Sequence, residues 1–114
     1  MHVSVLGNPD DSVIVTVRGD LDIDSATILT TTLDQVLERP GSRVVVDLSG
    51  ISSCDSTGLS AFVVGYNRAA AAGGWLRLAA PADWMAGLLE TVGLTSRVAV
   101  YPGVADALAG QSRE

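Results

Sequence analysis

The chain is poor in the side chains from which metal sites, disulfides and catalytic triads are built. Its 114 residues include a single cysteine, Cys54, and a single histidine, His2, close to the amino terminus. One cysteine cannot form a disulfide within the chain, and one histidine at a frayed terminus cannot assemble a metal cluster or a Ser-His-Asp triad. These absences exclude most hydrolase and metalloenzyme functions, and we expect neither a metal nor a cofactor.

Lysine is absent, and acidic residues dominate the charge. Seven arginines stand against 13 Asp and Glu residues, for a formal net charge of −6, and the arginines do not cluster. We therefore expect no direct binding to nucleic acid, whose phosphates are neutralised by grouped basic side chains. Apolar runs are interrupted by Gly, Arg or Asp well short of the roughly 20 residues of a membrane span, and no signal-like segment is present. The sequence predicts a soluble, cytoplasmic protein without a membrane segment.

Aromatic residues are also scarce, at 4% of the chain, whereas hydrophobic residues make up 47%. The core must therefore be built from Val, Leu, Ile and Ala, which suits an α/β layer fold. A chain of this length buries one core but not two. We expect a single domain over residues 1–110 and a disordered tail over residues 111–114.

Short β-branched runs alternate with amphipathic stretches along the chain. The runs predict strands at residues 3–6, 13–17, 44–48, 75–79 and 98–100, of which the first two form a hairpin. Apolar residues at helical spacing predict helices over residues 24–40, 56–73, 81–93 and around 104–108. We expect Asp24 to cap the first helix and Pro81 to lie in the first turn of the third.

These elements follow the order β-β-α-β-α-β-α-β-α. A crossover between neighbouring parallel strands is right-handed in nearly all proteins, so repeated crossovers in one direction place their helices on one face of the sheet. The predicted fold class is therefore α/β, with one mixed, mostly parallel sheet of about five strands and the long crossover helices on one face.

A polar segment leads from the predicted strand at residues 44–48 directly into a helix, and Ser56 lies at this junction. Its hydroxyl is well placed to cap the helix by accepting a backbone N–H. The same position suits a phosphorylation site, because free N–H groups and the positive end of the helix dipole stabilise a phosphate. Asp55 beside it would strengthen the negative potential with which a phosphate repels a partner. From the residues alone, both roles stay open.

Two separated motifs resemble the signature of one family, the STAS family of bacterial anti-anti-sigma factors. One is the run Asp55-Ser56-Thr57-Gly58-Leu59, preceded by Val44-Val45-Val46-Asp47-Leu48 and followed by Gly73-Gly74. The other, Val17-Arg18-Gly19-Asp20-Leu21-Asp22, is similar to the second-strand motif of that family. The expected order of elements agrees with the family across essentially the whole chain, whereas Cys54 stands where many relatives carry a larger apolar residue.

The resemblance implies a regulator that is not an enzyme, namely an anti-sigma factor antagonist. In that family an anti-sigma factor with serine kinase activity phosphorylates the serine that corresponds to Ser56. The unphosphorylated form binds the anti-sigma factor and frees a sigma factor, and a metal-dependent serine phosphatase later restores the serine. The partner-binding residues that the resemblance implies are Asp20, Leu21, Asp22, Asp55, Ser56, Thr57, Gly58 and Leu59.

Several of these residues also have a purely structural explanation. Gly58 can be required for close packing as well as for the close approach of a partner, and Leu59 can belong to the core. Asp22 and Asp24 can cap a helix instead of touching a partner. We expect Cys54 to be a small buried thiol, because its acidic neighbour disfavours a thiolate.

Four other functions are alternatives to this one. For two of them the chain lacks essential residues, and the other two use the same fold in a different role. A phosphoacceptor receiver domain would need a lysine, which the chain does not have. A nucleotide-binding enzyme would need a glycine-rich loop after a strand, whereas Gly73-Gly74 precedes one. STAS domains also serve as subunits of transporter assemblies or stress-sensing complexes, and a structural adaptor would leave Ser56 unmodified. These last two alternatives stay open.

Overall fold

A β-hairpin opens the chain in the computed structural model, which describes residues 1–110. β1 (His2–Gly7) and β2 (Ser12–Leu21) pair antiparallel, with Val5 opposite Val15. In the turn between them Asp11 adopts a positive φ of 70°, which Asp tolerates better than most residues, and the Ser12 N–H donates to the Asp10 carboxylate. The predicted hairpin is confirmed, although β2 runs past residue 17 to Leu21.

The remaining elements confirm the predicted order. They are α1 (Ala26–Val36), β3 (Arg43–Cys54), α2 (Ser56–Ala71), β4 (Trp75–Ala79), α3 (Asp83–Thr91), a single 3₁₀ turn η1 (Leu94–Ser96), β5 (Val100–Tyr101) and α4 (Val104–Ala109). The predicted tail over residues 111–114 lies outside the described residues.

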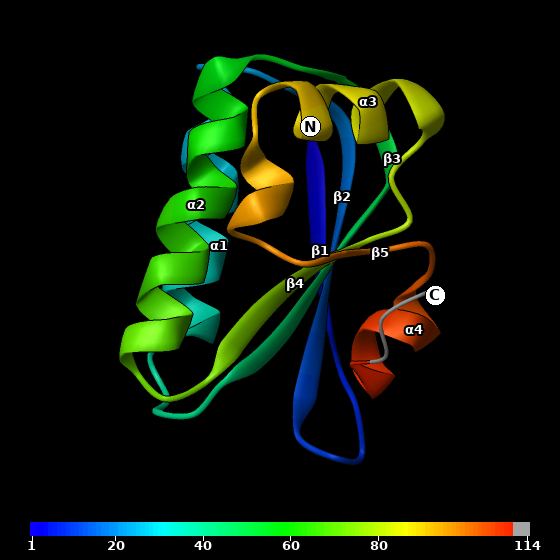
Figure 1. The fold of residues 1–114 in the computed structure, drawn as a ribbon. Coiled ribbons are helices and arrows are strands. Elements are labelled where there is room, and N and C mark those ends of the chain that lie inside the picture. Colours follow the sequence, from blue (N-terminus) through cyan, green and yellow to red (C-terminus); the bar gives the residue numbers. More distant parts are fainter. Residues whose placement is uncertain (111–114) are drawn as a thin grey trace.

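The five strands form one sheet in the order β1-β2-β3-β4-β5, in which only the β1–β2 pair is antiparallel. Figure 1 shows α1 and α2 side by side on one face of this sheet and the short α4 on the other. The crossover helices thus lie on one face, as predicted. The β2–β3 pairing carries two register shifts, between Thr16 and Arg18 and between Gly19 and Asp20.

The core is aliphatic, as the composition requires, and the sheet divides it into two parts. The larger part lies under α1, α2 and α3, and Phe62 is its only fully buried aromatic side chain among the described residues. The smaller part joins Val45 and Ala79 of the sheet to Ala107 of α4. Val44, Val45 and Val46 are all fully buried, because β3 is the central strand and its alternating side chains are covered on both faces.

Three details around α3 differ from the prediction. The helix begins at Asp83 with Ala82 as its N-cap, so Pro81 precedes the first turn instead of lying in it. Val92, which falls on the apolar stripe of the helix predicted over residues 81–93, is 53% exposed, because Gly93 turns the chain with a φ of 79° and Leu94 fills the core in its place. β5 begins at residue 100 instead of 98, and Val98 precedes it and is buried in the larger core.

Arg77 of β4 links the short helix α4 to the sheet through two contacts. Its guanidinium lies 3.7 Å from the centroid of the Trp75 ring, and its Nη1 donates to the backbone oxygen of Ala107 at 2.9 Å. Gly110, in a left-handed conformation, leaves room for this side chain, since a Cβ there would meet Arg77 Nη1 at 2.8 Å. A helix of six residues cannot persist on its own, so this anchor contributes to its stability.

We expect Arg77→Met to lower the free energy of unfolding by about 1–3 kcal/mol, because it removes a charged hydrogen bond and a cation–π contact. Urea denaturation measures this change. The matched control is Arg68→Met, which removes an ion pair to Asp34 between two half-exposed side chains and should cost less than about 1 kcal/mol. Equal losses in the two variants would contradict the role assigned to Arg77.

Candidate functional site

The two sequence motifs meet at the carboxyl ends of β2 and β3. In the parallel register Asp20 lies opposite Ser53 and Leu21 opposite Cys54. The Ser53 hydroxyl donates to the Asp20 carboxylate at 2.8 Å, and the Asp55 N–H donates to the Leu21 carbonyl at 3.0 Å. These bonds connect the end of one motif to the beginning of the other, so the two act as one surface.

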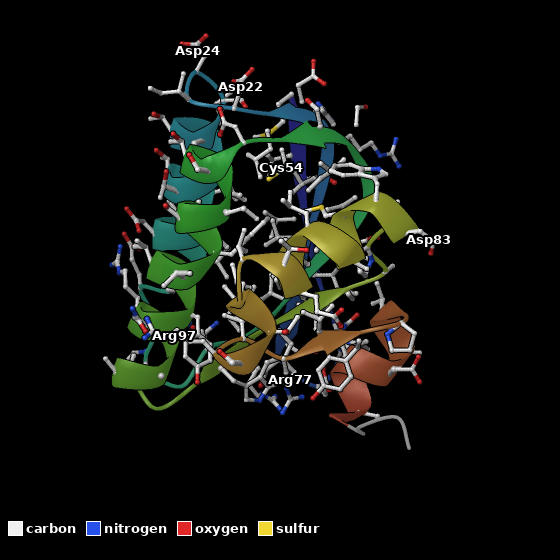
Figure 2. All side chains as sticks on the ribbon, turned by 45° about the horizontal axis from the view of Figure 1, so that its top comes forward. Asp22, Asp24, Cys54, Arg77, Asp83 and Arg97 are labelled. Carbon is white, nitrogen blue, oxygen red and sulfur yellow. The ribbon has the colours of Figure 1, made fainter. Side chains whose placement is uncertain are left out.

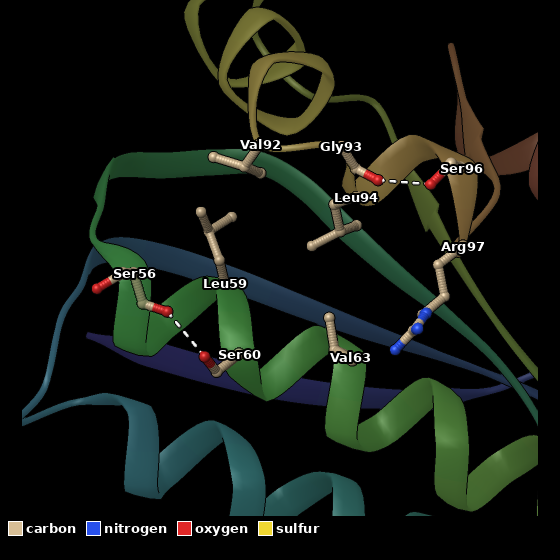
Figure 3. Close-up of a pocket in the computed structure, with 9 residues that line it drawn as sticks. All are labelled: Ser56, Leu59, Ser60, Val63, Val92, Gly93, Leu94, Ser96 and Arg97. Atoms are coloured by element: carbon tan, nitrogen blue, oxygen red, sulfur yellow. Dashed lines mark hydrogen bonds between the residues drawn. The ribbon is translucent and has the colours of Figure 1, made fainter.

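Ser56 is exposed and is the first residue of α2. The residue that caps this helix is Asp55, whose extended backbone lets a carboxylate oxygen accept the Gly58 N–H at 3.0 Å. Of the two roles left open for Ser56, the capping role is therefore excluded, because Asp55 holds that position. Among the described residues the Ser56 hydroxyl forms no hydrogen bond, and it lies open at the rim of a groove (Figure 3).

Asp22 organises the turn that leads from β2 into α1. Its carboxylate accepts the N–H groups of Asp24 and Ser25 at 3.1 and 3.0 Å, as well as the Ser25 hydroxyl at 3.0 Å. These bonds hold the pKa of Asp22 below its ordinary value, and the bond from the Ser25 N–H has the largest effect. Asp24 is exposed and caps nothing among the described residues, so the expectation that it caps the first helix was wrong: the N-cap of α1 is Ser25, and no side chain caps the helix by a hydrogen bond.

Ser25 is a residue that the sequence prediction missed. It is only 8% exposed, its hydroxyl donates to the Asp20 carbonyl at 2.8 Å, and that hydroxyl accepts the Asp22 N–H at 2.9 Å. The spacing of Asp22 and Ser25 could have indicated this turn from the sequence, since Asp and Ser side chains form hydrogen bonds to the backbone two or three residues away in turns. Ser25 thus fixes the backbone that presents Asp20 and Asp22, and Figure 2 shows Asp22 and Asp24 at the end of the molecule far from Arg77.

Of the other predicted contact residues, Thr57 is exposed but Leu21, Gly58 and Leu59 are buried. Leu21 is fully covered, and Leu59 is 8% exposed. A Cβ on Gly58 would lie 2.6 Å from Leu21 Cγ, closer than real Cβ atoms approach, and 3.0 Å from the Leu21 carbonyl oxygen, which is a tight contact. The structure therefore places Leu21 and Gly58 in the packing between β2 and α2, and Leu59 in the larger core.

A groove of about 390 Å³ begins at Ser56 and runs between α2 and the turn that follows α3. Its floor is apolar, with Leu59 and Val63 from one side and Leu94 from the other, and Arg97 lies at the far end (Figure 3). The sequence prediction missed this groove, because residues 92–97 reach α2 only through the tertiary fold.

Cys54 is half-buried at the same end of the sheet. Burial, and secondly the negative charge of Asp55, raise the pKa of its thiol to about 11. At neutral pH the side chain is a protonated, weakly nucleophilic thiol, which agrees with the expected structural role.

Within residues 1–110 no three His, Cys, Asp or Glu side chains are grouped closely enough to hold a metal ion. In the same range, no helix has the length and apolar character needed to cross a bilayer.

A scan against protein families identifies the fold. The family model described as "Mlab, STAS domain" matches residues 4–101, which is most of the chain and includes both motifs. The chain belongs to the STAS domain family. A search of curated protein sequences gives no significant match.

Solved structures show the same STAS fold at low sequence identity. A proposed anti-sigma factor antagonist from Thermotoga maritima superposes with a TM-score of 0.85 at 22% identity, over 97% of this chain and 95% of the other. The Bacillus cell fate determinant SpoIIAA in its phosphorylated form gives 0.73 at 14%, over 96% and 98%. A sulfate transporter family protein from Wolinella succinogenes gives 0.73 at 23%, over 85% and 81%. The fold is thus shared by regulators and by transporter proteins.

We expect Gly58→Ala to destabilise this STAS domain by about 1–3 kcal/mol, because the added methyl group collides with Leu21. Gly87→Ala is the matched control: a Cβ on this helical glycine meets nothing within 4 Å, so the change should be neutral or stabilise by up to about 1 kcal/mol. Thermal and urea unfolding measure both. Loss of stability in the Gly87 variant but not in the Gly58 variant would refute the packing role.

We also expect Cys54 to react slowly with iodoacetamide at neutral pH. A pKa raised from 9.0 to about 11 leaves about a hundredfold less thiolate than in the unfolded chain, and partial burial slows the reaction further. Alkylation rates of the folded and the urea-unfolded protein, followed by mass spectrometry from pH 7 to 10, test this. Equal rates in the two states would show that the thiol is not shielded.

Proposed function

We propose that this STAS domain is an anti-sigma factor antagonist. In its unphosphorylated form it binds an anti-sigma factor that is also a serine kinase, and so releases a sigma factor. Phosphorylation of Ser56 by that kinase ends the binding. The observation that carries this proposal is the exposure of Ser56 at the first position of α2, where a kinase can reach its hydroxyl.

The charge around Ser56 explains how a phosphate acts as a switch. Asp20, Asp22 and Asp55 already gather at this end of the sheet, in a chain of net charge −6. A phosphate adds about 1.5 to 2 further negative charges at pH 7. Docking would then require burying a dianion beside existing carboxylates. A loss of about 3 kcal/mol in binding free energy reduces affinity more than a hundredfold.

The predicted contact residues divide into two groups in this proposal. The exposed side chains Asp20, Asp55, Ser56 and Thr57, together with the half-buried Asp22, touch the partner. The buried residues Leu21 and Gly58 form the β2–α2 packing that sets the position of Ser56, and Leu59 is a core residue at the floor of the groove.

The remaining parts of the proposal follow from the partner-switching role. The protein acts in the cytoplasm as a ligand and a kinase substrate, and it catalyses no reaction. A metal-dependent serine phosphatase regenerates the free hydroxyl. The anti-sigma factor antagonist structures with the same fold, one of them in a phosphorylated form, support this assignment.

The second candidate function is that of a STAS subunit in a transporter assembly. It is favoured by the structural similarity to the sulfate transporter family protein, which also covers most of both chains. In that case Ser56 would remain unmodified. A gene for a small ATP-binding kinase next to this one favours sigma regulation, and a gene for a permease favours transport.

Incubation with the cognate anti-sigma factor kinase and ATP should place one phosphate on Ser56, located by mass spectrometry of peptides. Phosphate found only at other residues would refute the assignment. In a binding assay without ATP, Ser56→Ala should retain affinity and Ser56→Asp should lose about tenfold or more, since the charge is what blocks docking. Ser60→Asp, one helical turn further along the exposed face of α2, is the control for an added charge at a different position.

A further inference from the structure

The two edges of the sheet are protected to very different degrees. β5 is two residues long, Pro102 follows it, and α4 packs against Tyr101. Short strands, proline and a covering helix are the devices by which proteins prevent an edge from pairing with another chain. β5 carries all three of these devices.

β1 lacks two of these devices, because it is neither short nor interrupted by proline, and α1 contacts it on only one face of the sheet. It is six residues long, five of them are exposed, and it contains no proline and no Asp, Glu, Lys or Arg. Its register with β2 runs from His2 to Gly7 without a bulge, and among the described residues no strand pairs with its outer side. Val5 and Leu6 are 50% and 63% exposed, and as neighbours in a strand they project from opposite faces.

We propose that a second copy of this chain covers this edge. The β1 strands of the two copies pair antiparallel, which joins their sheets into one continuous sheet. The outward N–H and C=O groups of an edge strand match those of an antiparallel copy of the same strand, so the contact is self-complementary.

Between two copies of this acidic chain, charge favours a contact through β1 over a contact through an acidic surface. Two chains of net charge −6 repel one another, and the repulsion is smallest where the contact strand itself is uncharged. A two-fold axis perpendicular to the sheet reverses the strand direction, so the acidic end with Asp20 and Asp22 in one copy lies far from the same end in the other. The pairing therefore does not bring the two acidic surfaces together.

The two-fold axis also restricts the register. Opposed residues in an antiparallel pair lie on the same face of the sheet, so their positions must both be odd or both be even. Among the registers that meet this condition, two leave only one residue of each β1 strand without a partner. In one, Val5 faces Val5 of the second copy, and in the other, Ser4 faces Ser4 of the second copy.

Both Ser56 hydroxyls remain exposed at opposite ends of such a dimer. Dimerisation is therefore independent of phosphorylation and goes beyond the proposed function. A contact through one strand is smaller than a standard protein interface, so we expect weak association, with a Kd of roughly 10 µM to 1 mM.

Sedimentation equilibrium of the purified chain from about 5 µM to 1 mM tests the proposal. We expect a monomer–dimer equilibrium that Val5→Lys weakens about tenfold or more, because a charge then lies in the contact. Val64→Lys is the matched control, since Val64 on α2 is 47% exposed, nearly as much as Val5, and should leave the equilibrium unchanged. Ser56→Asp should also leave it unchanged, which separates this test from that of the proposed function.

Disulfide trapping in a Cys54→Ser background supplies a second measurement that does not depend on a destabilising change. Either Ser4→Cys or Val5→Cys should give an oxidised dimer, and Val64→Cys should give none above background. A chain that stays monomeric up to the highest concentration, or equal weakening by Val5→Lys and Val64→Lys, would overturn the proposal. Circular dichroism verifies that each variant is folded.

Discussion

The backbone of Asp55 is the point on which the geometry of the Ser56 surface depends. Its N–H bonds to Leu21 at the end of β2, and its carboxylate caps α2 at Gly58. One residue thereby connects two parallel strands to the helix that follows, and Ser56 projects from the first position after it. The Ser56 hydroxyl is exposed because the Asp55 carboxylate, and not this hydroxyl, caps the helix.

The helix cap also sets the electrostatics of the surface. The positive end of the α2 dipole is partly neutralised by the Asp55 carboxylate, so a phosphate on Ser56 would share the first turn with an existing negative charge. On the α1 side, the Asp22 carboxylate accepts the N–H groups of Asp24 and Ser25 in the turn before the helix, and these bonds lower its pKa. The acidic character of this end of the molecule is thus built into both helix starts.

The order of elements and the sheet topology could be predicted from sequence because they follow from periodicity and from the handedness of crossovers. The meeting of the Asp20 and Asp55 segments could be predicted too, since parallel strands end at one edge of a sheet. The capping residue of α2 could not, because Asp and Ser both serve as N-caps and only the extended backbone at Asp55 decides between them. The buried position of Gly58 against Leu21 and the groove ending at Arg97 depend on how helices sit on the sheet, which local patterns do not specify.

The register shifts between β2 and β3 have a consequence for how this segment tolerates change. β3 has 12 residues where β2 has 10, and the extra length is taken up by the irregularities before Arg18 and Asp20. Such bulges increase the local twist and reset which side chains face each other. Deleting one residue of β3 before Ser53 and away from these two irregularities would turn every following side chain to the opposite face, and Ser53 would lose Asp20. This stretch of chain therefore accommodates substitutions far more readily than changes in length.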